Sequence, residues 1–174
     1  MTNPADQRAQ ALLRFNRDIL DAALAVVAGY ESAAPQRFAE HAGPHLRHVI
    51  EHYEALIARG NGAIDYDARA RDTAVERCPA VARGRLESLK TLLAGGSAAM
   101  LAAPVAVRTL GGVNGEQSFT TISTLGRELM FLASHAVHHF AVLKLHALAH
   151  GVTLAEELGK APATVAHERA KEAA

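Results

Sequence analysis

Residues 123–151 read STLGRELMFLASHAVHHFAVLKLHALAHG, and this stretch decides the fold class. Ser123 and Thr124 are residue types that cap the start of a helix, and Gly151 is typical of a helix end. Between residues 129 and 148 the stretch is apolar on nearly all sides, which predicts a helix buried at the centre of a helical protein. Four histidines, one lysine and one serine interrupt this run and argue against a membrane span.

Three further helices are expected upstream of this one. The first covers residues 3–30, because it opens with an Asn-Pro pair and its apolar residues recur at three- and four-residue spacings. The second starts at Pro44 and stops near Gly60, and the third spans 79–94. We predict that the four helices pack around a common core, which makes the fold class all-α.

The connections between the helices predict two further features. The segment 60–78 is charged and too long for a tight turn, so we interpret it as a crossover along the helices. The runs 104–110 and 117–122 flank a glycine-rich turn and indicate a small β-hairpin between the third and fourth helices. No linker divides the chain, so 1–174 is expected to be one domain with a C-terminal tail that frays after about residue 165.

Composition limits the partners of the protein. Lys and Arg number 18 and Asp and Glu number 18, and this zero formal charge argues against nucleic acid or an acidic membrane surface as the main partner. The single cysteine, Cys78, excludes an intramolecular disulfide and suits a cytoplasmic protein. The unusual residue type is histidine, because ten occur in 174 residues and most of them are clustered.

Two histidines of the fourth helix have the spacing of metal ligands. His135 and His139 are four residues apart, so they stand on one face about one turn from each other and can bind one metal ion together. Burying two imidazoles without partners costs about 1–3 kcal/mol each, which favours a shared ligand. His138 lies on a neighbouring edge and outside this pair. Glu128 lies on the same helix face as His135 and His139 but about 10 Å from His135 along the helix axis. It is therefore a candidate catalytic residue rather than a ligand.

The second helix carries His45, His48 and His52, and any of the three can complete a three-histidine set. Three neutral nitrogens with one open position are the pattern of catalytic zinc, which lowers the pKa of bound water or holds an anionic or thiolate ligand. Imidazole sets also accept nickel, cobalt or iron. Three other histidines are expected to be ordinary surface or core residues: His41, His150 and His167.

The crossover and Cys78 admit functional interpretations that are less favoured. Arg69 and Arg71 can orient an anionic substrate, but a solvated loop whose charges pair with one another is the favoured interpretation. Cys78 has no basic helix-terminus environment, so an inert thiol is favoured over a nucleophile.

Several stretches together resemble a DinB-like protein, a member of a superfamily of metal-dependent helical proteins named for a damage-inducible protein. They are GPHLRHVIEHY at 43–53, the acidic and basic residues of 64–72, STLGREL at 123–129 and SHAVHH at 134–139. The resemblance implies a four-helix bundle with up-down-down-up topology, which fits the long connection 60–78. It also implies a divalent metal held by one histidine of the second helix and an H-x-x-x-H pair of the fourth.

Carried onto this sequence, the resemblance selects three ligands. The pair is His135 and His139, and the third ligand is the histidine followed by two apolar residues and an acid, which is His48 in His48-Val-Ile-Glu51. The alternatives on the second helix are His45 and His52. Many members have a glutamine three residues after the last histidine, where this chain has Val142, so one polar contact is missing here.

The resemblance implies a metal-dependent transferase or hydrolase that acts on a small molecule with zinc or nickel as cofactor, because characterised relatives include thiol-dependent transferases and a mycothiol-dependent isomerase. A low-molecular-weight thiol is then an expected partner. Two alternatives are a non-catalytic stress protein that binds metal or a small ligand, and a helical dimerisation module whose histidines pack in the core. The fourth helix is apolar on nearly all sides, more than one bundle can cover, and this predicts a homodimer.

Overall fold

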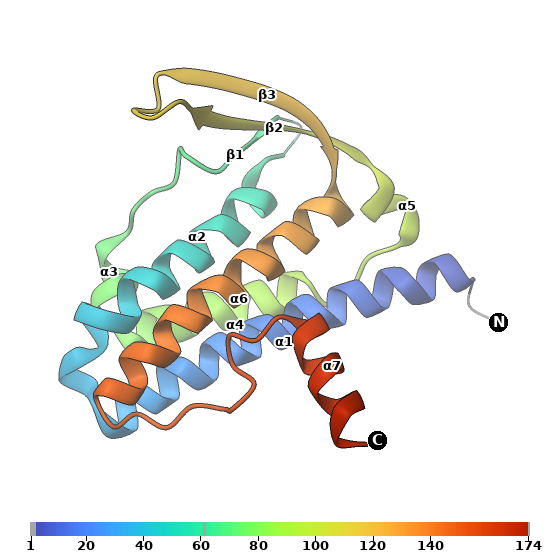
Figure 1. Ribbon diagram of the computed structural model, residues 1–174. Coiled ribbons are helices and arrows are strands. Elements are labelled where there is room, and N and C mark those ends of the chain that lie inside the picture. The colour runs from blue at the N-terminus through green and yellow to red at the C-terminus, as the bar shows by residue number, and fades with distance from the viewer. Residues whose placement is uncertain (1–2, 61, 174) are drawn as a thin grey trace.

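The computed structural model describes residues 3–60 and 62–173 and is predominantly helical, with a three-stranded sheet at one end (Figure 1). The four long helices are α1 (Pro4–Ala33), α2 (Gly43–Ala58), α4 (Pro79–Leu92) and α6 (Leu125–Ala149). Helices α1 and α2 each contact both α4 and α6, so the four enclose one core. Fully buried side chains come from all four, among them Leu20, Ile50, Leu86 and Leu129.

Side-chain caps start two of these helices where the sequence predicts. Asn3 Oδ1 accepts from the backbone N–H of Ala5 at 3.0 Å, and Thr124 Oγ1 accepts from that of Arg127 at 3.2 Å. Helix α2 begins at Gly43, where a Cβ atom would lie 1.8 Å from the backbone oxygen of Glu76. Only glycine therefore allows the following crossover to pack against the start of α2.

The predicted hairpin is present, but the protein is not all-α. Strand β2 (Pro104–Gly111) pairs antiparallel with β3 (Gln117–Thr124) over its full length. Strand β1 (Ile64–Asp65) adds a third, parallel strand beside β2, with Ile64 opposite Val107. The crossover therefore contributes to a mixed sheet, and the fold class is corrected to a helical protein with a small sheet.

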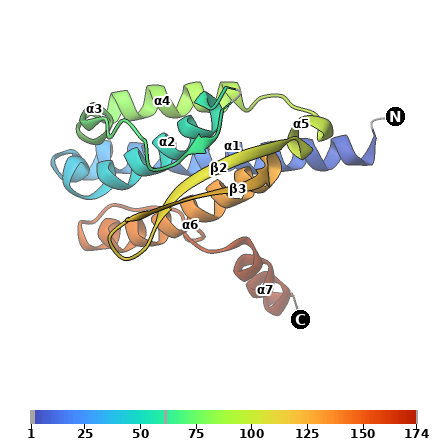
Figure 2. The same ribbon diagram turned by 90° about the horizontal axis from the view of Figure 1, so that it is seen from above.

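The shorter segments are also more structured than the sequence predicts. A turn of 3-10 helix, η1 (Pro35–Arg37), leads into a turn of π-helix, η2 (Phe38–Ala42), which continues directly into α2. Helix α3 (Thr73–Arg77) lies in the crossover, and α5 (Ala98–Ala102) precedes β2. The tail, expected to fray after about residue 165, instead forms helix α7 (Pro162–Glu172), which projects from the other helices (Figure 2).

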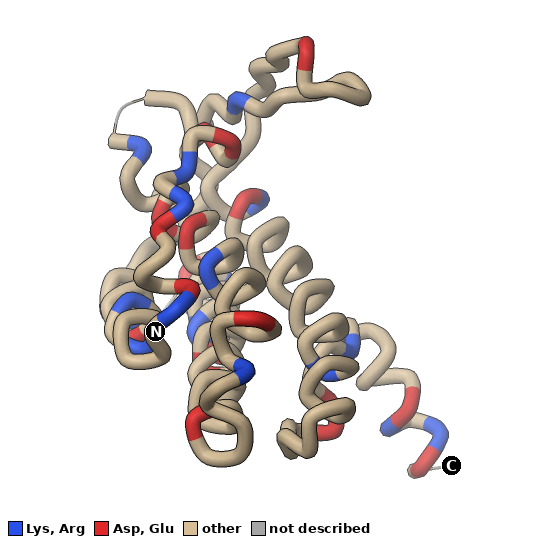
Figure 3. The backbone as a smooth tube through the Cα atoms, turned by 90° about the vertical axis from the view of Figure 1, so that its left-hand side faces the viewer, with Lys and Arg blue, Asp and Glu red and all other residues tan. Residues whose placement is uncertain are grey.

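Charged residues of both signs are frequent on α1, α2, α4 and α7, whereas α6 carries only Arg127, Glu128 and Lys144 over its whole length (Figure 3). Among the described residues, no helix combines the length and the apolar character that crossing a membrane requires. Helix α6 packs against both α1 and α2 and buries one face, which includes Leu129 and Leu132, while Leu145 and Leu148 on its other side are exposed. The expectation of a helix buried at the centre is therefore met on one face only.

Candidate metal centre

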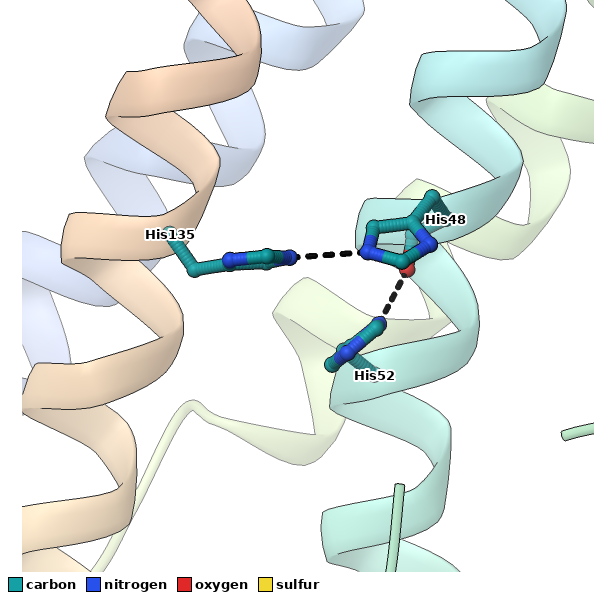
Figure 4. A group of neighbouring side chains, drawn as sticks. All are labelled: His48, His52 and His135. Atoms are coloured by element: carbon teal, nitrogen blue, oxygen red, sulfur yellow. Dashed lines mark hydrogen bonds between the residues drawn. The ribbon is translucent and has the colours of Figure 1, made fainter. Parts of the chain in front are cut away.

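Helices α2 and α6 lie side by side and face each other through histidines. At 100° per residue, His45, His48 and His52 fall within about 60° of one another on α2, and His135 and His139 within about 40° on α6. Figure 4 shows His48 and His52 of α2 directed toward His135 of α6. The apolar stripe of each helix is buried next to these faces, so packing of the core brings the two sets of imidazoles together.

The three histidines selected from the sequence meet in the structure. Nε2 of His48 lies 2.8 Å from Nε2 of His135, and Nε2 of His139 lies 3.2 Å from the same His135 atom. The rings of His48 and His139 have centroids 4.6 Å apart. Tetrahedral zinc with bonds of about 2.0–2.1 Å places its ligand nitrogens about 3.4 Å apart. The two separations at His135 Nε2 are somewhat shorter than this, so the rings would have to move slightly apart to admit a metal ion between them.

His45 contacts the far side of this set. Its Nδ1 lies 2.8 Å from Nδ1 of His139. If His139 donates its Nδ1–H to His45, its Nε2 keeps the lone pair that a metal ligand needs. His45 is thereby suited to orient His139, and it is a poorer candidate for the ligand from α2 than His48.

His52 is also part of the cluster. Nitrogens of His48, His52 and His135 all lie within 4.8 Å of one another. His52 Nδ1 donates to the backbone oxygen of His48 at 2.7 Å, which leaves Nε2 as the free nitrogen. Its ring stacks on Tyr66 with centroids 5.3 Å apart. His52 is therefore a competent alternative or additional ligand.

Arg69 from the crossover lies against the same imidazoles. Its Nη1 donates to Nδ1 of His48 at 2.6 Å and lies 3.0 Å from Nδ1 of His52, while its Nε is buried without a partner. A guanidinium only donates, so His48 Nδ1 accepts and His48 Nε2 carries the proton toward His135. Metal binding through His48 Nε2 therefore requires this proton to leave and the contact with Arg69 to change.

Burial keeps these imidazoles neutral near pH 7. Desolvation, helped by the neighbouring His52 and Arg69 charges, lowers the pKa of His48 to about 3. Desolvation likewise lowers the pKa of His52 and of His139 to about 4, and it lowers the pKa of His135. Neutral imidazole is the form that binds a metal ion, so the protonation states fit the proposed donor set.

Glu128 is buried beside the cluster rather than within it. Its Oε2 accepts from the Tyr66 hydroxyl at 2.8 Å and its Oε1 from the Ser123 hydroxyl at 2.6 Å. Because Tyr66 stacks on His52, Glu128 positions this ring through Tyr66. Both carboxylate oxygens are thus occupied, which agrees with the expectation that Glu128 is not a ligand.

The crossover is not the solvated loop that the sequence favours. Tyr66 is 8% exposed, and the buried Glu51 accepts from the backbone N–H of Asp72 at 2.6 Å. Tyr66 and Arg69 thereby become part of the site. Ile64 and Tyr66, two large apolar residues in this otherwise charged segment, are sequence signals that could have indicated this burial.

The remaining histidines divide into two groups. His167 is exposed, in line with the expectation of an ordinary residue, and His138, expected to lie on a neighbouring edge, is exposed with its ring edge-on to that of His139. His41 and His150, expected to be ordinary residues, instead stack on each other with ring centroids 4.3 Å apart. The lone thiol of Cys78 is exposed.

No family model matches the chain, and no solved structure matches it. The chain is similar to a protein named FK506-binding protein 5 from Rhizopus delemar, with 26% identity over 104 residues. That stretch is 60% of the present chain and 27% of the relative, so the chain spans little more than a quarter of the relative's length. The functional assignment therefore rests on the arrangement of the histidines.

Proposed function

We propose that the protein is a DinB-like four-helix bundle with up-down-down-up topology that binds a divalent metal, zinc or nickel, between α2 and α6. We further propose that it is a metal-dependent thiol transferase or hydrolase acting on a small molecule. The observation that carries this proposal is that Nε2 of His135 lies 2.8 Å from Nε2 of His48 and 3.2 Å from Nε2 of His139. His52 is close to the same centre, since nitrogens of His48, His52 and His135 all lie within 4.8 Å of one another. Three histidines with an open position are typical of catalytic rather than structural zinc.

The surrounding residues support chemistry on an anionic or thiolate ligand. A bound divalent metal would lower the pKa of a coordinated water or thiol. Arg69 holds a positive charge beside His48, and its unpartnered Nε can donate to an anionic group of a substrate or thiol. Tyr66 and Phe131 cover the sheet end of the cluster, where their rings lie 5.5 Å apart, and help to exclude water.

Metal analysis of single variants tests the ligand assignment. We expect His48→Ala, His135→Ala and His139→Ala each to lose the tightly bound equivalent of zinc or nickel while the helical circular dichroism signal persists. His167→Ala, on the exposed face of α7, is the matched control and should bind as the wild type does. Retention of the tight equivalent in all three ligand variants would exclude this metal centre.

A second candidate is a non-catalytic metal-binding protein that uses the same histidines. Val142 favours it, because this apolar residue replaces a glutamine that many DinB-like members carry near the metal. Metal-dependent loss of free sulfhydryl groups in mixtures of a low-molecular-weight thiol and an electrophile separates the two functions. Turnover that disappears with His135→Ala supports the transferase, whereas tight metal binding without turnover across a panel of thiols supports the second candidate.

A further inference from the structure

The row of histidines does not end at the metal centre. His45 of α2 also faces His146 of α6, with ring centroids 6.2 Å apart. The C-terminal end of α6 and the start of α2 are remote from the sheet (Figure 1). There His41, from η2, lies against His146 of α6 and His150, which caps the end of α6, with ring centroids 5.1 and 4.3 Å away. We call His41, His146 and His150 the outer cluster, and His48, His135 and His139 the inner cluster.

The outer cluster repeats the composition of the inner one. His146 and His150 are four residues apart, like His135 and His139, and each lies eleven residues, or about three turns, further along α6. His41 precedes His48 by seven residues, or about two turns, and η2 runs directly into α2. Each cluster thus combines one imidazole from the α2 side with an i, i+4 pair from α6.

One nitrogen of the outer cluster is left without a partner. His41 Nε2 is shielded from solvent and makes no hydrogen bond. The nearest charged atom recorded beside it is Oε2 of Glu40, 3.7 Å away, and this carboxylate is also bound by Arg37 at 2.8 Å. A shielded imidazole nitrogen without a hydrogen bond is unfavourable unless a ligand meets it.

The chemistry of these groups selects the class of ligand. Several imidazoles with a neighbouring carboxylate form a donor set for borderline divalent metals such as zinc, nickel or cobalt, and not for calcium or magnesium. The rings of His146 and His150 stack on His41 with interplanar angles of 16° and 19°, and among the described residues the nitrogens of His48, His52 and His135 converge within 4.8 Å whereas those of the outer cluster do not. The outer rings must therefore turn to direct their nitrogens at one ion. This rotation makes the outer cluster a weaker site than the inner one.

We propose that His41, His146 and His150 form a second, outer site for a divalent transition metal, with Glu40 within reach as a fourth ligand. His45 lies between the two sites, since its ring centroid is 5.1 Å from that of His139 and 6.2 Å from that of His146. The two proposed metal sites would then lie in one row along α2 and α6.

Zinc stoichiometry in paired variants tests this proposal. We expect the wild type to bind two equivalents, one at least tenfold weaker than the other. H146A/H150A should lose the weaker equivalent and keep the tight one, whereas H135A/H139A should do the reverse. H138A/H167A removes two exposed histidines outside both clusters and should keep both equivalents.

The outcomes separate the two sites. A single equivalent that only H135A/H139A removes overturns the outer site and leaves the inner one intact. A single equivalent that only H146A/H150A removes supports the outer site and overturns the metal centre of the proposed function.

A second variant is needed because H146A/H150A changes the last turn of α6. His150→Asn serves here, since asparagine is accepted at a helix C-terminus. It should weaken the weaker equivalent at least tenfold, and unchanged binding by this folded variant overturns the proposal.

Discussion

The hydrogen bond from Arg69 to His48 determines which ring nitrogen of His48 carries the proton. The guanidinium donates to His48 Nδ1 at 2.6 Å, so the proton of His48 resides on Nε2, where a metal ion would bind. The same side chain places a positive charge beside the metal position. Arg69 therefore opposes metal binding in two ways while it offers an anion-binding group to a substrate.

Replacement of Arg69 should therefore tighten metal binding. We expect Arg69→Gln to raise zinc affinity about tenfold, equivalent to about 1.4 kcal/mol, because both the repulsive charge and the hydrogen bond to His48 are lost. Competition with a chelating dye measures this change. Arg69→Lys keeps the charge and is the control, and weaker binding by Arg69→Gln would mean that Arg69 supports the ligands instead.

Two buried tyrosines provide a matched pair for stability. The Tyr53 hydroxyl donates to Asn16 Oδ1 at 2.8 Å in the core, whereas the buried Tyr30 hydroxyl has no hydrogen-bond partner. We expect Tyr53→Phe to lower the free energy of unfolding by about 1–3 kcal/mol, since it leaves Asn16 Oδ1 unpaired. Tyr30→Phe should be neutral or stabilising. Urea denaturation of both variants checks this, and equal effects would contradict it.

At the scale of elements, the interface between α2 and α6 makes the metal-free protein sensitive to acid. Burial lowers the pKa of His48 to about 3 and that of His52 and His139 to about 4, below the ordinary value of about 6.5. At a pH between the lowered pKa values of the folded state and the ordinary value, these histidines bind protons in the unfolded chain but not in the folded chain. Stability is therefore complete above about pH 6.5 and is lost as the pH falls toward 4.

The urea midpoint of chelator-treated protein measures this dependence. We expect it to fall steadily from pH 7 to pH 4.5, and the variant His48→Asn/His139→Asn to show a shallower decrease because two of the responsible imidazoles are absent. A midpoint that stays constant over this range would show that these imidazoles remain accessible to protons in the folded state.

The long helices could be predicted because their signals are local. Capping residues and apolar periodicity mark α1 and α6, and the glycine-rich turn marks the hairpin of β2 and β3. Strand β1 has two residues, and it exists because Ile64 and Asp65 pair with β2. The turn η2 is similarly defined by its packing against neighbouring helices. Neither element carries a periodic signal of its own.

Only part of the candidate site could likewise be predicted from local sequence signals. The pair His135 and His139 follows from spacing within one helix. The choice among the histidines of α2 does not, because three share one face and the register of α2 against α6 depends on packing of the whole core. The contributions of Tyr66 and Arg69 depend on the path of the crossover, which long-range hydrogen bonds to Glu128 and Glu51 determine.

At the scale of the whole molecule, α6 presents an apolar surface that suits a second copy of the chain. Met130, Leu145 and Leu148 are 49%, 69% and 68% exposed, and Lys144 is the one charged residue of α6 in this part of the helix. We predict a homodimer at tens of micromolar in sedimentation experiments. Leu145→Lys/Leu148→Lys should be monomeric, whereas Val113→Lys at the hairpin tip should stay dimeric, and a monomeric wild type would contradict the prediction.

The close approach of Gly43 to the backbone of Glu76 fixes the start of α2 beside α3. This residue lies in the chain between His41 and His45, and the backbone of Glu76 occupies the space that a methyl group would need. Gly43→Ala would push the start of α2 away from α3 and shift the imidazoles on either side relative to those of α6. The absence of one carbon atom thus sets how the imidazoles before and after residue 43 face those of α6.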